Sequence, residues 1–180
     1  AYFKCLVGDT PYLGYGPRAA ALHLERDEVL LQWSIDLSCC FYSFSLPSCW
    51  QKYICFGKPL SAEEAGRPAG SGRYYAALTT CPMGLISSVG LVQQYMRRMC
   101  VAVGMPEEAE LSMRGMVPQG GRVHTEYADD WKELRKVLIS DLLANAKSEW
   151  QVALVQEAER RGLIVNHSKT EEAVLRGGYL

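Results

Sequence analysis

The nine residues VLLQWSIDL, at positions 29–37, indicate the centre of the fold. They form an almost unbroken apolar run of strand length, and the acidic residue Asp36 lies near its carboxyl end. An apolar run this short is typical of a strand whose two faces are both buried within a sheet. We therefore expect a central strand that delivers the carboxylate of Asp36 to one end of the sheet.

The residues on either side of this run alternate between strand-like and helix-like patterns. A weak helical pattern over 19–31 precedes it, and Ser48 is the expected cap of a short helix over 49–52. Further strands are expected at 53–56, 73–78, 163–165 and 175–180, further helices at 87–100 and 148–161, the latter capped by Ser148 and Gly162, and loops at 57–72 and 104–122. This mixture predicts an α+β fold, with helices packed on one face of an antiparallel sheet.

The composition is that of a globular domain with a hydrophobic core. Of its 180 residues 48% are hydrophobic, and no apolar run is long enough for a membrane span. The formal net charge of -1 gives no support to nucleic-acid binding, which usually requires a basic face. The seven cysteines form no C-x-x-C pair, and the chain does not open with a signal-peptide pattern. We expect reduced thiols in an intracellular protein that is not secreted, and no zinc site.

Asp36 and the adjacent pair Asp129-Asp130 are the candidate catalytic groups. Transfer of a nucleotide uses two divalent cations, and Mg²⁺ prefers hard oxygen ligands that come from separate elements and meet at one point. An acid at the end of one strand and an acid in a tight hairpin beside it would supply such ligands. We therefore predict that Asp36, Asp129 and Asp130 bind two Mg²⁺ ions, which Mn²⁺ could replace.

The pair Asp129-Asp130 has a second interpretation, which the sequence leaves open. After it, apolar residues recur at helical spacing, at Trp131, Leu134, Val137, Leu138, Leu142 and Leu143. A helix within 132–147 would place the two acids in its first turn, where they interact favourably with the helix dipole. Under this interpretation Asp36 is a turn residue, and the chain is an unrelated α+β interaction domain.

Four segments, in their order along the chain, resemble reverse transcriptases of retroviruses and retrotransposons. The first is IDLSCCFYSFSLP at 35–47, and the second runs from RYY at 73–75 through CPMG at 81–84 to Gln93. The third is YADD at 127–130, and the fourth is GLIVNHSKT at 162–170. The terminal LRGGYL resembles the start of the primer-grip hairpin, so that the resemblance covers roughly residues 33–180.

The resemblance implies a role for each candidate residue. Asp36, Asp129 and Asp130 would be the metal ligands. The ring of Phe41 would lie under the sugar of the nucleotide and exclude a 2′-hydroxyl by its size. The remaining implied contacts are those of Met83 and Gly84 with nucleotide and template, of Gln93 with the loop or the template, of Tyr127 with primer or template, and of Lys169 with the triphosphate.

The resemblance also implies a domain organisation and a set of partners. Residues 1–32 would be partial fingers or an N-terminal extension, and residues 33–180 a polymerase palm core truncated before the thumb. The partners would be an RNA or DNA template with its primer and a dNTP, with no membrane; the oligomeric state stays open. His124-Thr125-Glu126 stand where the family usually has apolar residues. They favour an alternative, a decayed or domesticated palm that binds nucleic acid or protein without catalysis.

Overall fold

The central strand β1, Glu28–Ser38, is the axis of a five-stranded antiparallel sheet. In the computed structural model, which describes residues 16–70, 72–112 and 115–176, β1 pairs along one side with β3. Its other side pairs with β4 and β5, and β2 extends the sheet beyond β3. The bounds are Arg122–Tyr127 for β2, Asp130–Leu138 for β3, Ile164–Val165 for β4 and Glu171–Arg176 for β5. The prediction of a buried central strand is confirmed.

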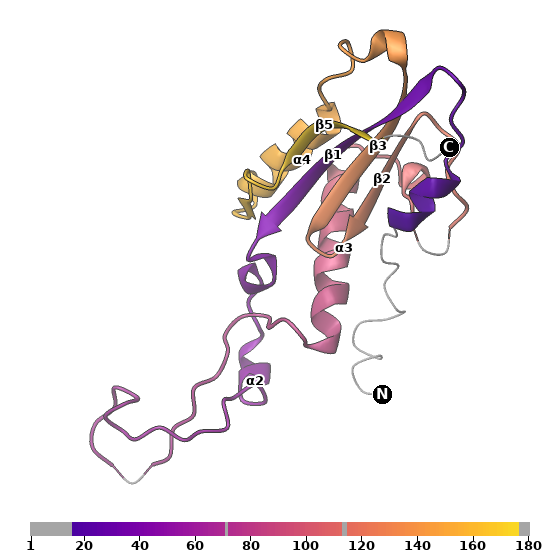
Figure 1. Cartoon of the computed structure of the whole chain (residues 1–180). Helices are drawn as coiled ribbons and strands as arrows, with labels where there is room; N and C mark the ends of the chain where they lie inside the picture. Colours follow the sequence, from indigo (N-terminus) through magenta and orange to yellow (C-terminus); the bar gives the residue numbers. More distant parts are fainter. Residues whose placement is uncertain (1–15, 71, 113–114, 177–180) are drawn as a thin grey trace.

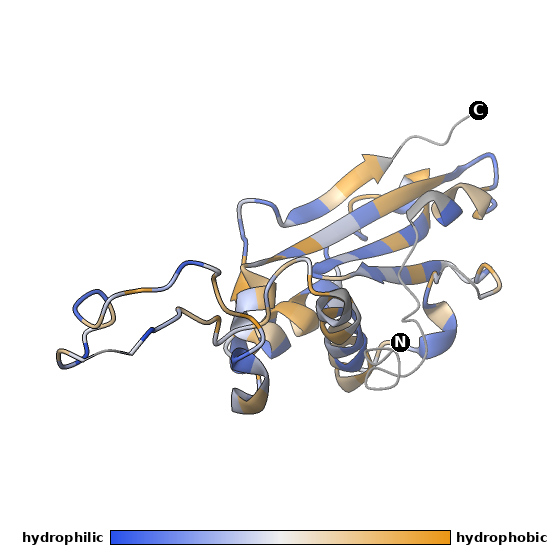
Figure 2. Ribbon diagram, turned by 90° about the horizontal axis from the view of Figure 1, so that it is seen from below, coloured by the Kyte–Doolittle hydropathy of each residue, from blue (hydrophilic) through white to orange (hydrophobic). Residues whose placement is uncertain are grey.

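Two helices, α3 and α4, cover one face of this sheet (Figures 1 and 2). Leu31, Trp33 and Ile35 of β1 point to this face and are buried. The core also contains Val92, Met96 and Met99 of α3, Ile86–Ala102, and Leu154 and Ala158 of α4, Glu149–Arg160. The expected α+β arrangement is therefore present. None of the helices in the described part of the chain combines the length and apolar character of a membrane span.

The helix α4 is capped at both ends as the sequence predicts. The backbone N–H of Gln151 donates a hydrogen bond to Ser148 Oγ at 3.0 Å. Gly162 follows the helix with a φ of +78°, a left-handed conformation that favours glycine. The predictions of α3 and of the short strand β4 are likewise confirmed, although α3 extends slightly beyond both of its expected ends.

The other helical segments are short. The predicted helix after Ser48 is confirmed as α2, Ser48–Gln51, but Pro47 occupies the N-cap position. Four 3₁₀ turns complete the elements: η1 at Gly16–Ala21, η2 at Cys40–Ser43, η3 at Glu107–Ala109 and η4 at Ile139–Asp141. The helix expected over 19–31 is wrong, because the end of this segment pairs with β3 and belongs to β1.

The helix expected within 132–147 is also wrong, because the first part of this segment belongs to β3 and the 3₁₀ turn η4 follows it. β3 lies between β1 and β2, and pairing on both sides satisfies its backbone groups. Trp131 and Val137 belong to the core under the helices, whereas Leu134 packs with Val123 in a second cluster. The apolar spacing therefore came from the two faces of a strand and not from one face of a helix.

The described residues 52–70 and 72–80 form a long arm that leaves the body of the domain (Figure 1). The strands expected at 53–56 and 73–78 are wrong, since only isolated bridges join the two sides of the arm. Several aromatic side chains of the arm are exposed, among them Tyr53 at 77%. Without a buried face to stabilise it, the pairing does not extend into a sheet.

Two parts of the sequence-based predictions lie outside the described residues. Residues 1–15 belong to the expected fingers or N-terminal extension, and residues 177–180 belong to the expected last strand. The preceding residues of that strand are confirmed as the end of β5, which pairs with β1.

Replacing Ser148 with alanine is expected to lower the free energy of unfolding by about 1–2 kcal/mol. The change removes the cap of α4 and the hydroxyl that donates to the buried carboxylate of Glu133. Urea unfolding measures the effect. Ser140→Ala is the matched control, because its hydroxyl donates to the exposed Asp141. Equal losses in the two variants would contradict the role given to Ser148.

Candidate active site

The antiparallel pairing of β1 with β3 places Asp36 directly opposite Asp130. Asp129 precedes Asp130 in the tight turn between β2 and β3, at which Tyr127 pairs with Asp130. Two segments distant in the sequence thus bring the three predicted carboxylates to one end of the sheet. The hairpin interpretation of Asp129-Asp130 is confirmed, and the helix-terminus interpretation is wrong.

Gln93, on α3, holds the hairpin turn from beneath. Its Oε1 accepts a hydrogen bond from the backbone N–H of Ala128 at 2.7 Å, and its Nε2 donates to the carbonyl of Glu126 at 3.1 Å. Ala128 has a φ of +55°, a left-handed conformation that a non-glycine residue adopts only when its surroundings impose it. Gln93 is 1% exposed, so of its two predicted roles the structure supports loop support over template contact.

Asn166 and Lys169, from the turn after β4, contact Asp36. Asn166 Nδ2 donates to Asp36 Oδ2 at 3.0 Å, and the Asn166 backbone N–H donates to the Asp36 carbonyl at 2.8 Å. Lys169 Nζ lies 3.7 Å from Asp36 Oδ1. The expectation that Lys169 belongs to the site therefore agrees with its position. Asn166 was missed, although it lies in the same recognised segment as Lys169.

The carboxylates of the site repel one another. Burial raises the pKa of Asp129, and the negative charge of Asp36 adds to this rise, whereas a backbone hydrogen bond and Lys169 oppose it. The pKa of Asp130 is also raised, first by partial desolvation and then by the charges of Asp129 and Asp36. In the absence of a cation, the fold therefore holds the carboxylates close together against their electrostatic repulsion.

The donor set of the site fits divalent cations with oxygen ligands. Asp36 offers carboxylate oxygens from a strand and Asp129 from the hairpin turn beside it, and oxygen ligands are those that Mg²⁺ prefers. The thiol of Cys40 is close enough to feel the charge of Asp129. Burial, with that charge, raises the pKa of the Cys40 thiol to about 12.

The remaining predicted residues differ in their exposure to solvent. Phe41 lies in η2, shortly after Asp36, and packs in the hydrophobic core. Met83 and Gly84 form the exposed turn before α3, where Gly84 has a φ of +91°. Tyr127 is exposed at the end of β2. None of these positions contradicts the predicted contacts with nucleotide, template or primer, which stay predictions.

Sequence reasoning also missed a group of polar residues beneath the hairpin. His124 and Glu126 on β2 and Glu133 on β3 are buried, although their type is typical of a solvent-facing position. Alternation along a strand does not say which face is the buried one when both faces carry polar residues. Only their partners on α3, α4 and the loop before β2 reveal their position.

No protein-family model matches this sequence, and no curated protein matches it significantly. The assignment of a function therefore rests on the geometry of the site and on the motifs that form it.

Asp129→Asn is expected to raise the midpoint of thermal unfolding at pH 7 in buffer free of divalent cations. Since the pKa of Asp129 is higher in the folded chain than in the unfolded one, folding loses stability as the pH rises through the folded pKa. The advantage of the variant should disappear below about pH 4, where the unfolded carboxyl is also protonated. Added Mg²⁺ should stabilise the wild type more than the variant.

The control for this prediction is Asp27→Asn, which removes an exposed acid outside the site. It should leave the Mg²⁺ effect unchanged. A lower midpoint for Asp129→Asn than for the wild type at pH 7 would show that the carboxylates do not repel one another.

Gln93→Ala is expected to lower the free energy of unfolding by about 2–3 kcal/mol, because it leaves the Ala128 N–H and the Glu126 carbonyl buried without partners. It should also weaken stabilisation by Mg²⁺, since the turn loses its support. The neighbouring Gln94 is exposed, and Gln94→Ala serves as the matched control. Chemical unfolding with and without Mg²⁺ measures both effects. Equal free energies of unfolding for Gln93→Ala and Gln94→Ala would show that Gln93 does not support the turn.

Proposed function

We propose that this chain is the palm core of a reverse transcriptase of the retroviral and retrotransposon type, an RNA-directed DNA polymerase. One observation carries the proposal: Asp36 lies opposite Asp130, with Asp129 beside it in a hairpin turn. A palm domain needs metal-binding acids from a central strand and from the hairpin next to it. The segments that supply these acids are the ones that resemble the first and third motifs of the family.

The donor set supports two divalent cations, Mg²⁺ or Mn²⁺. Asp36 and Asp129 would be the principal ligands, and Asp130 the weaker partner. When bound, the ions would activate the 3′-hydroxyl of the primer and stabilise the charge on the triphosphate and on the leaving pyrophosphate. Because the carboxylates repel one another, a bound cation would neutralise this repulsion and would stabilise the folded chain.

The proposed reaction forms a bond between the 3′-oxygen of the primer and the α-phosphorus of the dNTP. The bond from that phosphorus to the β-phosphate breaks, and pyrophosphate leaves. The protein contributes mainly by positioning. Gln93 fixes the turn that carries Asp129, and Asn166 orients the carboxylate of Asp36.

Lys169 is the proposed partner of the triphosphate. Its side chain is 67% exposed, and its ammonium group lies 3.7 Å from Asp36 Oδ1. The exposed ammonium group would contact a phosphate oxygen and would stabilise or protonate the leaving pyrophosphate. Phe41, Met83, Gly84 and Tyr127 are assigned to nucleotide, template and primer on the strength of the resemblance.

The alternative is a palm that binds nucleic acid or protein without catalysis. Its ground is the polar sequence on both sides of the turn, His124-Thr125-Glu126 before it and Trp131-Lys132-Glu133 after it. His124 and Glu126 are partnered by each other inside the domain, and the hairpin forms with these residues in place. This observation supports the catalytic proposal, and an activity measurement separates the two functions.

Primer extension on an RNA template with dNTPs and Mg²⁺ tests the proposal. The wild type should extend the primer, and Asp129→Asn should reduce the rate by about 100-fold or more, because a weakened metal site would no longer stabilise the negative charge of the transition state. Asp27→Asn should retain the wild-type rate. Equal rates of primer extension by the wild type and Asp129→Asn would refute the catalytic assignment. Binding of primer and template without extension by the wild type would establish the non-catalytic palm.

A further inference from the structure

A cluster of buried polar side chains lies between α3 and β2, on the opposite face of the sheet from Asp36. Cys100 lies on α3, and His124 and Glu126 occupy alternate positions of β2, so that they point to the same face. Each is at most 2% exposed. The Cys100 sulfur, a ring nitrogen of His124 and a carboxylate oxygen of Glu126 all lie within 4.8 Å of one another.

Glu110 adds a fourth polar group to this cluster. It forms a parallel bridge with His124, which sets the two side chains next to each other, and it is 7% exposed. Glu110 Oε2 accepts a hydrogen bond from Arg97 Nε at 2.7 Å. Among the described residues, Glu110 Oε1 and Glu126 Oε2 have no hydrogen-bond partner. Buried carboxylate oxygens are normally paired, so two unpaired ones in one place point to a cation.

Both ring nitrogens of His124 face an oxygen atom that accepts hydrogen bonds. Nε2 lies 3.1 Å from the carbonyl oxygen of Pro106, which can only accept, so Nε2 carries a proton. Nδ1 lies 2.6 Å from Glu126 Oε1. A neutral imidazole would therefore present the lone pair of Nδ1 to a carboxylate. At this hydrogen-bond distance a proton holds the two atoms together, and a metal ion that displaced the proton would take its place between them. Metal-binding histidines commonly donate their other N–H to a backbone carbonyl in this way.

We propose that Cys100, His124, Glu126 and Glu110 form a structural Zn²⁺ site. Zn²⁺ accepts sulfur, nitrogen and oxygen ligands together in a tetrahedral arrangement, whereas Mg²⁺ prefers oxygen ligands. The charges also balance. One thiolate and two carboxylates carry three negative charges, which equal those of Zn²⁺ and the Arg97 guanidinium. The burial of all four ligands is typical of a closed, structural site and not of a catalytic one.

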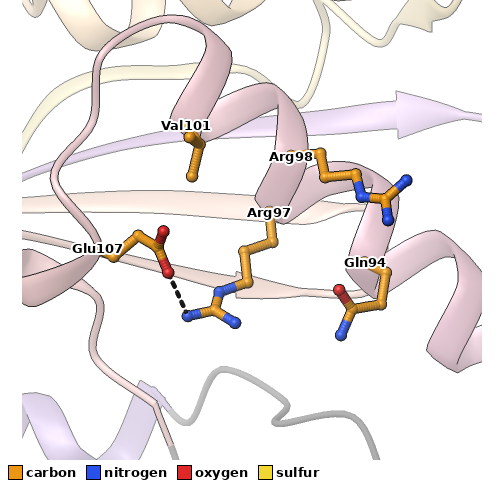
Figure 3. A pocket seen from close by; sticks show the side chains of 5 residues that line it. All are labelled: Gln94, Arg97, Arg98, Val101 and Glu107. Atoms are coloured by element: carbon orange, nitrogen blue, oxygen red, sulfur yellow. Dashed lines mark hydrogen bonds and ion pairs between the residues drawn. The ribbon is translucent and has the colours of Figure 1, made fainter. Parts of the chain in front are cut away.

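Arg97, whose guanidinium contacts Glu110 of this cluster, also lines a surface pocket of about 250 Å³ (Figure 3). Arg97 connects the two places, because its guanidinium contacts Glu107 at the pocket at 3.0 Å and Glu110 in the cluster at 2.7 Å. The other lining residues are Gln94, Arg98 and Val101.

The ion would tie β2 to α3 directly below the hairpin turn. Glu126 would be held through its side chain by the ion and through its carbonyl by Gln93. Cys100 and Gln93 lie on the same helix, so both contacts fix the hairpin to α3. The inference concerns the assembly of the domain and holds whether or not the chain is a polymerase.

Metal titration of the chelator-treated chain tests the proposal. Mg²⁺ is kept in excess, so that the carboxylates at Asp36 and Asp129 are occupied. Co²⁺, the spectroscopic substitute for Zn²⁺, should give a thiolate-to-metal charge-transfer band that saturates at one equivalent. Zn²⁺ should abolish this band by displacement and raise the midpoint of thermal unfolding. No band and no Zn²⁺-dependent rise would overturn the proposal and leave a His124–Glu126 ion pair only.

Two variants identify the ligands. Replacing Cys5 and the exposed Cys39, Cys49 and Cys55 by serine should leave the band intact, because none of them is a proposed ligand. Cys100→Ser on that background should abolish the band and weaken Zn²⁺ binding by at least about tenfold. A band that survives Cys100→Ser, or one that disappears with the exposed cysteines, would refute the site even if Cys100→Ser folds poorly.

Asp129→Asn separates this site from the proposed active site. The variant should bind Co²⁺ with an unchanged band, because Asp129 lies in the other metal site. Loss of the band in Asp129→Asn would place the ion at the carboxylates and contradict the inference. Failure of primer extension in the wild type with an intact Co²⁺ band would refute only the polymerase assignment.

Discussion

The register between β1 and β3 is the constraint on which the core and the candidate site both depend. With Asp36 opposite Asp130, the residues Leu31, Trp33 and Ile35 point toward the helices. A slip by one residue would turn every side chain of the strand to the other face, which would expose two large apolar side chains and one tryptophan. Burial of this face therefore secures the position of Asp36. The hydrophobic effect, acting on neighbouring residues, places a carboxylate that it does not itself stabilise.

The face of the hairpin that packs under the helices carries a buried charge, Glu133, whose partners come from the hairpin itself and from the start of α4. Glu133 is fully buried between Arg122 and Arg135, with Nε of Arg122 at 2.6 Å, and it also accepts a hydrogen bond from Ser148 at the start of α4. A buried carboxylate without these partners would cost several kcal/mol. The pairs therefore add little net stability, but they make the docking of α4 onto the hairpin specific.

The candidate site is arranged before any cation is present. Gln93 supports the turn, Asn166 orients Asp36, and the backbone of β1 and β3 sets the spacing of the acids. The stability of the rest of the domain offsets the repulsion between the carboxylates. A site of this kind needs no reorganisation when a cation binds, which is the condition for strong electrostatic stabilisation of developing charge.

The sequence by itself determined the elements whose signals are local. The apolar run of β1, the caps of α4 and the amphipathic pattern of α3 each rest on neighbouring residues, and each was found in its expected place. The grouping of Asp36 with the acids at 129–130 was also predicted. The order of the motifs along the chain indicated it, whereas the spacing of the residues did not. Only the tertiary structure decided that the segment after Asp130 is a strand. Its apolar residues fit a helix equally well, and pairing with β1, its distant neighbour, outweighed that local preference. The same reason applies to Asn166 and to the cluster of Cys100, His124 and Glu126, whose members acquire their chemistry from partners that lie far away along the chain.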